Sequence, residues 1–215
     1  MKNARTFLQA VGIGVMITAI GLGVAACDTG GAAALAPPNG GSGGGGTSVG
    51  QYGIEFQRYG GGYRVTGRTG TFTAISIPAT HNGLPVVSIG DWAFWNNNLT
   101  SVTIGNNVTH IGNMAFLRNN LASVTIGNSV THIGDRAFEA NSLTSVTIPN
   151  SVTHIGNMAF SGNNLASVNI PNSVTHIGDM AFEANSLASV NIPNSVTHIG
   201  DMAFEANSLT SVIDT

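Results

Sequence analysis

Residues 99–142 read LTSVTIGNNVTHIGNMAFLRNN followed by LASVTIGNSVTHIGDRAFEANS, two near-copies of one 22-residue segment. Three further copies follow without a slip: LTSVTIPNSVTHIGNMAFSGNN, LASVNIPNSVTHIGDMAFEANS and LASVNIPNSVTHIGDMAFEANS. A leucine therefore recurs every 22 residues at positions 99, 121, 143, 165, 187 and 209. A fixed period in the twenties, with apolar residues at fixed places, indicates structural repeats that stack on one another.

Seven apolar positions in each repeat predict how one turn of the stack is built; in the first copy they are Leu99, Val102, Ile104, Val108, Ile111, Ala115 and Phe116. Val102 and Ile104 lie two residues apart and so share one face of a strand. Ala115 and Phe116 come four and five residues after Ile111, a spacing that predicts a short helical or 3-10 turn. No single repeat can bury its apolar side alone, so we expect a β-rich solenoid with a continuous core.

The repeats organise most of the chain. Rungs start at residues 72, 99, 121, 143, 165 and 187, with a partial one at 209, and the first contains five extra residues around Asn82 and Gly83. We therefore assign residues 72–215 to the solenoid. Residues 51–71 hold two alternating runs around a triple glycine, which predicts a β-hairpin that caps the first edge. An asparagine ends each repeat (Asn119, Asn141, Asn163, Asn185 and Asn207), and we expect its side chain to bond the backbone of its own rung and of a neighbouring one.

The first 50 residues indicate export. Lys2 and Arg5 precede an apolar run that ends in Val-Ala-Ala before Cys27, the only cysteine of the chain. Residues 1–26 match a secretory signal, and the position of Cys27 resembles a lipoprotein lipobox, in which this thiol receives lipid, palmitate included. The alternative is an uncleaved anchor, because roughly 20 apolar residues can span a bilayer. Residues 27–50 are dominated by glycine and predict a flexible tether.

The repeat string L-x-x-V-x-I-P-x-x-V-x-x-I-G-x-x-A-F resembles that of BspA-like leucine-rich-repeat surface proteins, and the resemblance covers about residues 52–215. It implies a leucine-rich-repeat solenoid. It also implies a surface protein that adheres to host matrix proteins or to other bacterial surface proteins. The family often has cysteine where this chain has Asn119 and its equivalents, a departure that leaves the period unchanged.

Two sets of outward-facing residues are candidates for binding. The residues on either side of the strand valine form one set: Ser101, Thr103, Ser123, Thr125, Ser145, Thr147, Ser167, Asn169, Ser189 and Asn191. Leucine-rich repeats commonly bind on the concave side that this strand forms, so we expect a partner protein or glycan there. The alternative is that these small polar residues only tolerate strand stacking.

The second set is a column of histidines at His110, His132, His154, His176 and His198. Stacked imidazoles can bind a metal ion or respond to pH. A straight column offers a tetrahedral metal at most two ligands, and duplication copies any residue, useful or not. We therefore favour a surface without a metal, and no cofactor is expected.

Composition excludes several classes of function. Only 8% of residues are charged and the formal net charge is −3, so no basic stripe is available to bind nucleic acid. No nucleophile has a distinctive base beside it, so we expect no enzyme. The sequence predicts a lipid-anchored protein of the cell envelope, at the outer membrane or cell surface, that touches the membrane only through its anchor and mediates adhesion or recognition. The alternative is a structural spacer that self-associates through the partial C-terminal rung.

Overall fold

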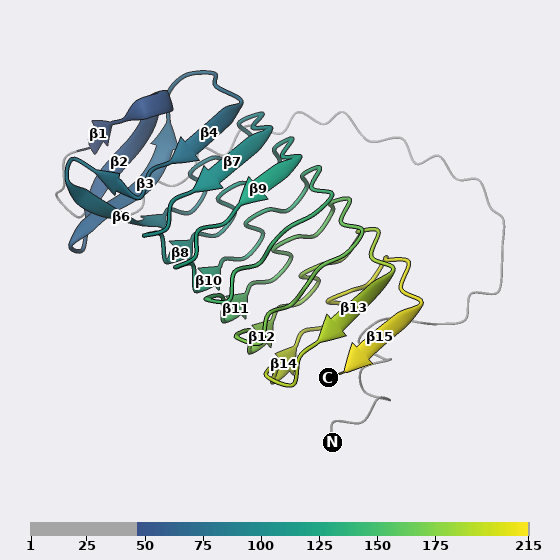
Figure 1. Cartoon of the computed structure of the whole chain (residues 1–215). Helices are drawn as coiled ribbons and strands as arrows, with labels where there is room; N and C mark the ends of the chain where they lie inside the picture. The colour runs from purple at the N-terminus through teal and green to yellow at the C-terminus, as the bar shows by residue number, and fades with distance from the viewer. Residues whose placement is uncertain (1–46, 215) are drawn as a thin grey trace.

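The computed structural model describes residues 47–214, and the side chains of residues 47–211. The predicted signal peptide, the lipidation site Cys27 and most of the tether lie outside the described residues. Within them, 22-residue rungs stack along one axis into a solenoid, with a β-hairpin at the N-terminal end (Figure 1). No helix in the described part of the chain is long and apolar enough to cross a bilayer.

Two sheets run along the solenoid. The larger has the order β1-β2-β3-β6-β8-β10-β11-β12-β14, and β5 pairs with β6 at its side. Its members are β1 (Thr47–Val49), β2 (Ile54–Tyr59), β3 (Gly62–Arg68), β5 (Thr80–His81), β6 (Leu84–Ile89), β8 (His110–Ile111), β10 (His132–Ile133), β11 (His154–Ile155), β12 (His176–Ile177) and β14 (His198–Ile199). A single 3-10 turn, Gln51–Gly53, precedes β2. Strand β3 pairs in parallel with β6, with a register shift between Tyr63 and Arg64. From β6 onward the strands of this main path are parallel and in register, one per rung.

The second sheet is made by the strand that follows each leucine. It consists of β4 (Ala74–Ile77), β7 (Ser101–Ile104) and β9 (Ser123–Thr125) at one end and of β13 (Ser189–Ile192) and β15 (Ser211–Asp214) at the other. Between these groups the pairing is reduced to isolated parallel bridges that join Thr147 to Asn169 and Asn169 to Asn191. This side of the solenoid is therefore held less by backbone pairing than by the core beneath it.

The core confirms the seven predicted positions. Leu99, Leu121, Leu143, Leu165 and Leu187 are fully buried, and the phenylalanines from Phe94 to Phe204 form one stack with ring centroids 5.2–5.5 Å apart. Burying a phenylalanine side chain contributes roughly 2 kcal/mol. Each ring lies against the ring of the next rung, so the core is continuous along the axis.

The segment before each asparagine departs from the expected helical turn. Residues 112–117 form two overlapping turns, in which Ala115 N–H donates to Gly112 C=O and Leu117 N–H to Met114 C=O. Met114 and Arg118 have left-handed φ angles of 56° and 55°, which a right-handed helix does not allow. Instead, the N–H groups of residues 114, 116 and 118 donate to C=O groups of residues 135, 137 and 139 in the next rung. Pairing between rungs replaces the helical ladder.

The buried asparagines join successive rungs, as the sequence predicts. Asn163 Oδ1 accepts from Leu143 N–H at 3.1 Å, and Asn163 Nδ2 donates to the C=O groups of Phe138 and Phe160 at 3.0 and 3.1 Å. The other four make the same bonds to their own and the preceding rung. The amide thus satisfies backbone groups at the turn, where no strand can pair them.

We predict that Asn163→Asp destabilises the protein by about 3 kcal/mol at neutral pH, because a carboxylate cannot donate to the two carbonyls and would be buried with its charge unpaired. The free energy of unfolding from urea titration measures this loss. Asn164→Asp is the control, since the Asn164 side chain is exposed and makes no hydrogen bond in the described structure. Equal losses in both variants would contradict the role of the asparagine column.

A glycine column permits the close stacking beside β8–β14. A Cβ atom at Gly156 would lie 2.7 Å from the backbone nitrogen and Oδ1 of Asp135 in the preceding rung. Gly112, Gly134, Gly178 and Gly200 have the same surroundings, with closest distances of 2.3–2.7 Å. The rungs can therefore approach one another here only because these positions lack a side chain.

We predict that Gly156→Ala lowers the free energy of unfolding by about 2 kcal/mol, since the added methyl group overlaps backbone that cannot move independently. Thermal and urea unfolding followed by circular dichroism measure the effect. Gly61→Ala should be close to neutral, because nothing lies within 4 Å of a Cβ at Gly61. An unchanged stability of Gly156→Ala would show that the stacking is looser than described.

Candidate functional site

The structure places the ten hydroxyl and amide residues named above on one side of the solenoid, and we call them the Ser/Thr/Asn face. Nine are exposed and Ser101 is partly buried. The valines between them point the other way: Val102 and Val190 are 2% exposed. In-register pairing aligns Ser101 with Ser123 and Thr103 with Thr125, but the sheet is interrupted between Thr125 and Thr147. The face therefore presents uncharged hydrogen-bonding groups in two rows, with a break in the strand pairing.

The histidines lie on the larger sheet, away from this face (Figure 1). Each pairs with the histidine of the next rung, from His110↔His132 to His176↔His198. The first four rings are stacked with centroids 4.6–4.7 Å apart and planes within 9°, whereas His198 is tilted by 37° at 5.9 Å. We call these five residues the His column.

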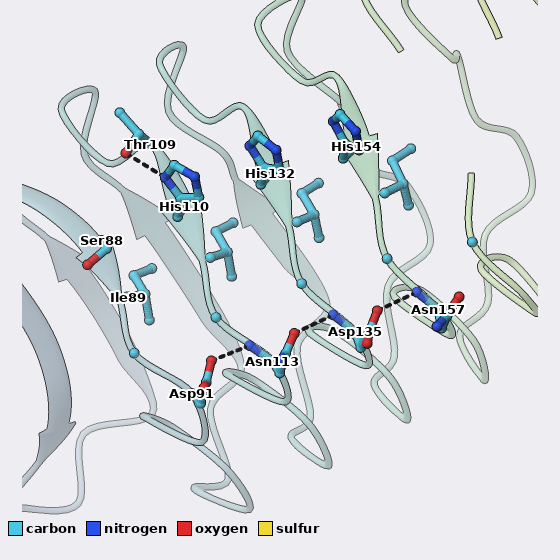
Figure 2. Close-up of a pocket in the computed structure, with 18 of the residues that line it drawn as sticks. Ser88, Ile89, Asp91, Thr109, His110, Asn113, His132, Asp135, His154 and Asn157 are labelled. Atoms are coloured by element: carbon cyan, nitrogen blue, oxygen red, sulfur yellow. Dashed lines mark hydrogen bonds between the residues drawn. The ribbon is translucent and has the colours of Figure 1, made fainter. Parts of the chain in front are cut away.

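A threonine orients each of the first four rings. Thr109 Oγ1 lies 2.8 Å from His110 Nδ1 and also 3.0 Å from the C=O of Val87 in the preceding rung (Figure 2). A carbonyl only accepts, so the single hydroxyl proton goes to it, and Nδ1 must then donate its proton to Oγ1. Thr131, Thr153 and Thr175 repeat this geometry with the next three histidines. In the neutral rings, Nε2 is left as an unprotonated acceptor.

Burial lowers the pKa of the His132 imidazole below its ordinary value, and the neighbouring His110 and His154 lower it further. If this ring and a neighbouring ring were both protonated, two like charges would lie about 5 Å apart. His132 is therefore neutral at pH 7, which is the state in which its Nε2 accepts a hydrogen bond.

A second ladder runs beside the His column and was missed by the sequence analysis. A glycine follows the larger-sheet strand in each rung, and the residue that follows this glycine is Asp or Asn. In all but the last rung its Oδ1 accepts the backbone N–H of the equivalent residue in the next rung at 2.7–2.9 Å. The Asp/Asn ladder consists of Asp91, Asn113, Asp135, Asn157, Asp179 and Asp201. Figure 2 shows the first four of them. The repeated Gly-Asp or Gly-Asn pair was the signal for it, because only these short side chains reach the next rung's backbone.

The geometry does not favour the metal site considered for the His column. The stacked rings point their Nε2 lone pairs in parallel, whereas zinc requires ligands that converge. Across residues 47–214, no group of three or more histidine, cysteine, aspartate or glutamate side chains is arranged to hold a metal ion.

Comparison with known proteins gives the family. The family model of the BspA type leucine rich repeat region matches residues 72–212 in six copies. The chain belongs to this family. No curated protein matches the chain.

Solved structures agree with this assignment of the BspA-type repeats. A leucine rich cell surface protein from Faecalibacterium prausnitzii is 30% identical with a TM-score of 0.56, and the match covers 78% of this chain and 54% of that one. The pneumococcal vaccine antigen PcpA gives 22% identity and a TM-score of 0.65 over 80% and 50% of the two chains. A leucine rich repeat protein of T. pallidum is 24% identical with a TM-score of 0.52, and the match covers 76% of this chain and 70% of that one. The chain thus spans about half the length of the first two.

We predict that the first four histidines of this BspA-type solenoid are protonated on Nδ1 rather than Nε2 in their neutral state. Nitrogen NMR shifts of the imidazoles at mildly alkaline pH measure the tautomer directly. A Thr131→Val and Thr153→Val double variant should release His132 and His154 from this tautomer while His110 and His176 keep it. Wild-type rings that are protonated mainly on Nε2 would disprove the assigned hydrogen bonds.

Proposed function

We propose that the chain is a non-enzymatic recognition module of the cell surface that adheres to a partner protein through its Ser/Thr/Asn face. The observation that carries this proposal is the face itself, with serine, threonine and asparagine repeated over five rungs and no charged residue among them. Such groups donate and accept hydrogen bonds at low desolvation cost, so a partner can be held by many weak contacts in series.

Two observations support the location. The similar protein from F. prausnitzii is described as a cell surface protein. The N-terminal residues of this chain resemble a lipoprotein signal that ends at Cys27. Acylation of Cys27, followed by the glycine-rich segment, would hold the solenoid at the envelope, at the outer membrane or cell surface, and raise its local concentration near a partner.

We predict that Ser145→Lys combined with Ser167→Lys weakens binding of the full chain to its matrix or bacterial surface protein by about tenfold or more, because two long charged side chains would block adjacent rungs. Biolayer interferometry against immobilised extracellular-matrix proteins measures it. The control is Asn150→Lys with Asn172→Lys, which adds the same charge to the same two rungs at exposed turn positions. Binding that survives the serine variant, or fails equally in both, rules out this face.

The competing hypothesis is a self-associating envelope spacer, and the same purified full chain tests it. Light scattering over a range of concentrations reports whether the full chain forms larger species. A monomer at every concentration that supports binding would favour recognition over self-assembly.

A further inference from the structure

A groove of about 720 Å³ runs along the larger sheet, on a surface that the proposed function does not use. It extends from Tyr59 and Arg64 at the hairpin to His198 near the other end. The His column forms one wall and the first four members of the Asp/Asn ladder form the other (Figure 2). Between the walls lie the column glycines, which have no side chain to fill the space.

The hydrogen-bonding capacity of the His column is directed outward. In His110, His132, His154 and His176 the threonine holds Nδ1, and Nε2 has no partner among the described residues. The rings cover one another's faces, so each offers a ligand its edge, not its face. The column is therefore a row of acceptors that repeats every 4.6–4.7 Å over its stacked part.

The opposite wall has spare capacity as well. Each Oδ1 of the ladder is used by the next rung, but the second terminal atom of Asp91, Asn113, Asp135 and Asn157 makes no hydrogen bond within the described chain. Asp91 and Asp135 thus offer a free carboxylate oxygen, and the two asparagines an amide group. This wall alternates charged acceptors with neutral donors.

The charges in the groove restrict what it can bind. Two carboxylates, Asp91 and Asp135, stand against one guanidinium, Arg64. Arg64 already has partners at the hairpin end. Its Cζ lies 3.8 Å from the centroid of the Tyr59 ring, and its Nε donates to Ser88 Oγ. Counted over these three groups, the groove is slightly negative, and it is rich in hydrogen-bond acceptors. Hydroxyl-bearing, uncharged ligands fit this chemistry, and anionic polymers do not.

The repeat distance separates the polymers that remain. An extended polypeptide advances about 3.3–3.4 Å per residue and loses register with the rungs within a few residues. An extended β-1,4-linked chain of hexopyranose units advances only slightly more per unit than the spacing between strands of a β-sheet, so it keeps approximate register over a few rungs, and it presents hydroxyl groups along both edges. Each sugar then meets one histidine and one ladder residue.

We propose that this groove binds an extended, uncharged polysaccharide along the solenoid axis, with one sugar unit per rung. Sugar hydroxyls donate to Nε2 of the His column and to the free carboxylate oxygens of Asp91 and Asp135, and accept from the amides of Asn113 and Asn157. The site lies on the sheet away from the Ser/Thr/Asn face, so it provides a second binding function that does not depend on the first.

Calorimetric titration of the full chain with β-1,4-linked glucose and N-acetylglucosamine oligomers of increasing length tests the proposal. Affinity should rise with each added unit until the oligomer covers the five histidines, about five units, and then level off. His132→Leu with His154→Leu should weaken binding of the longest oligomer by about tenfold, because two accepted hydrogen bonds are lost. Affinity that does not depend on length, or no binding of any oligomer, overturns the proposal.

Two further measurements complete the test. The first uses the wild-type chain, so it does not depend on the folding of a variant, and the second separates sugar binding from the proposed adhesion. In the wild-type chain, imidazole NMR signals of the His column should shift on adding the pentamer, and unshifted signals would place the sugar elsewhere. The Ser145→Lys and Ser167→Lys variant should bind the pentamer as the wild type does. Loss of sugar binding in that variant, or binding of an uncharged serine-rich peptide in place of sugars, would contradict the assignment.

Discussion

Every rung must satisfy its backbone through its neighbours at one fixed spacing, and the rest of the structure depends on this constraint. The strands do so through parallel pairing, but where the chain turns after each phenylalanine no strand is available. There the buried asparagine satisfies the backbone instead. Its amide donates to a phenylalanine carbonyl of its own rung and to one of the preceding rung. The glycine column meets the same constraint on the other sheet by allowing close approach. In this chain, therefore, stacking determines the residue at both positions.

Stacking also turns each outward position into a column, which explains why so few residues are charged. A charged residue that is copied in every rung would face its own charge about 5 Å away, at a cost that grows with the number of rungs. The Asp/Asn ladder shows how this cost is reduced. Its first four members, Asp91, Asn113, Asp135 and Asn157, alternate carboxylate and amide, although both types give the same Oδ1 bond to the next rung. Only at the C-terminal end do two aspartates, Asp179 and Asp201, follow each other in the ladder. The stacked serines and threonines carry no charge and avoid the cost altogether.

The sequence predicted what depends on period and burial. The rungs, the seven core positions and the asparagine bonds follow from side chains that repeat at fixed places, and the structure confirms them. The helical turn was wrong because Met114 and Arg118 adopt left-handed φ angles, which neither residue type favours. Pairing with the backbone of the next rung imposes that conformation, and residue propensities within one rung do not predict it. The Thr109–His110 bond also depends on a carbonyl from another rung, so adjacency in sequence did not reveal it.

The two proposed binding surfaces differ in how their ends are marked, and the N-terminal hairpin is the reason. Strand β3 pairs with β6, so the hairpin extends the larger sheet and leaves the Ser/Thr/Asn side to begin at β4. In the first rung, Ser88 takes the place of histidine and accepts a hydrogen bond from Arg64 of the hairpin. The groove therefore has one end marked by the Arg64 guanidinium. On the Ser/Thr/Asn face, the change along the axis is from threonine to asparagine between Thr147 and Asn169, and it introduces no charge. A directional polymer bound in the groove would meet this guanidinium at one end only, and that difference in charge favours one orientation of the polymer over the other.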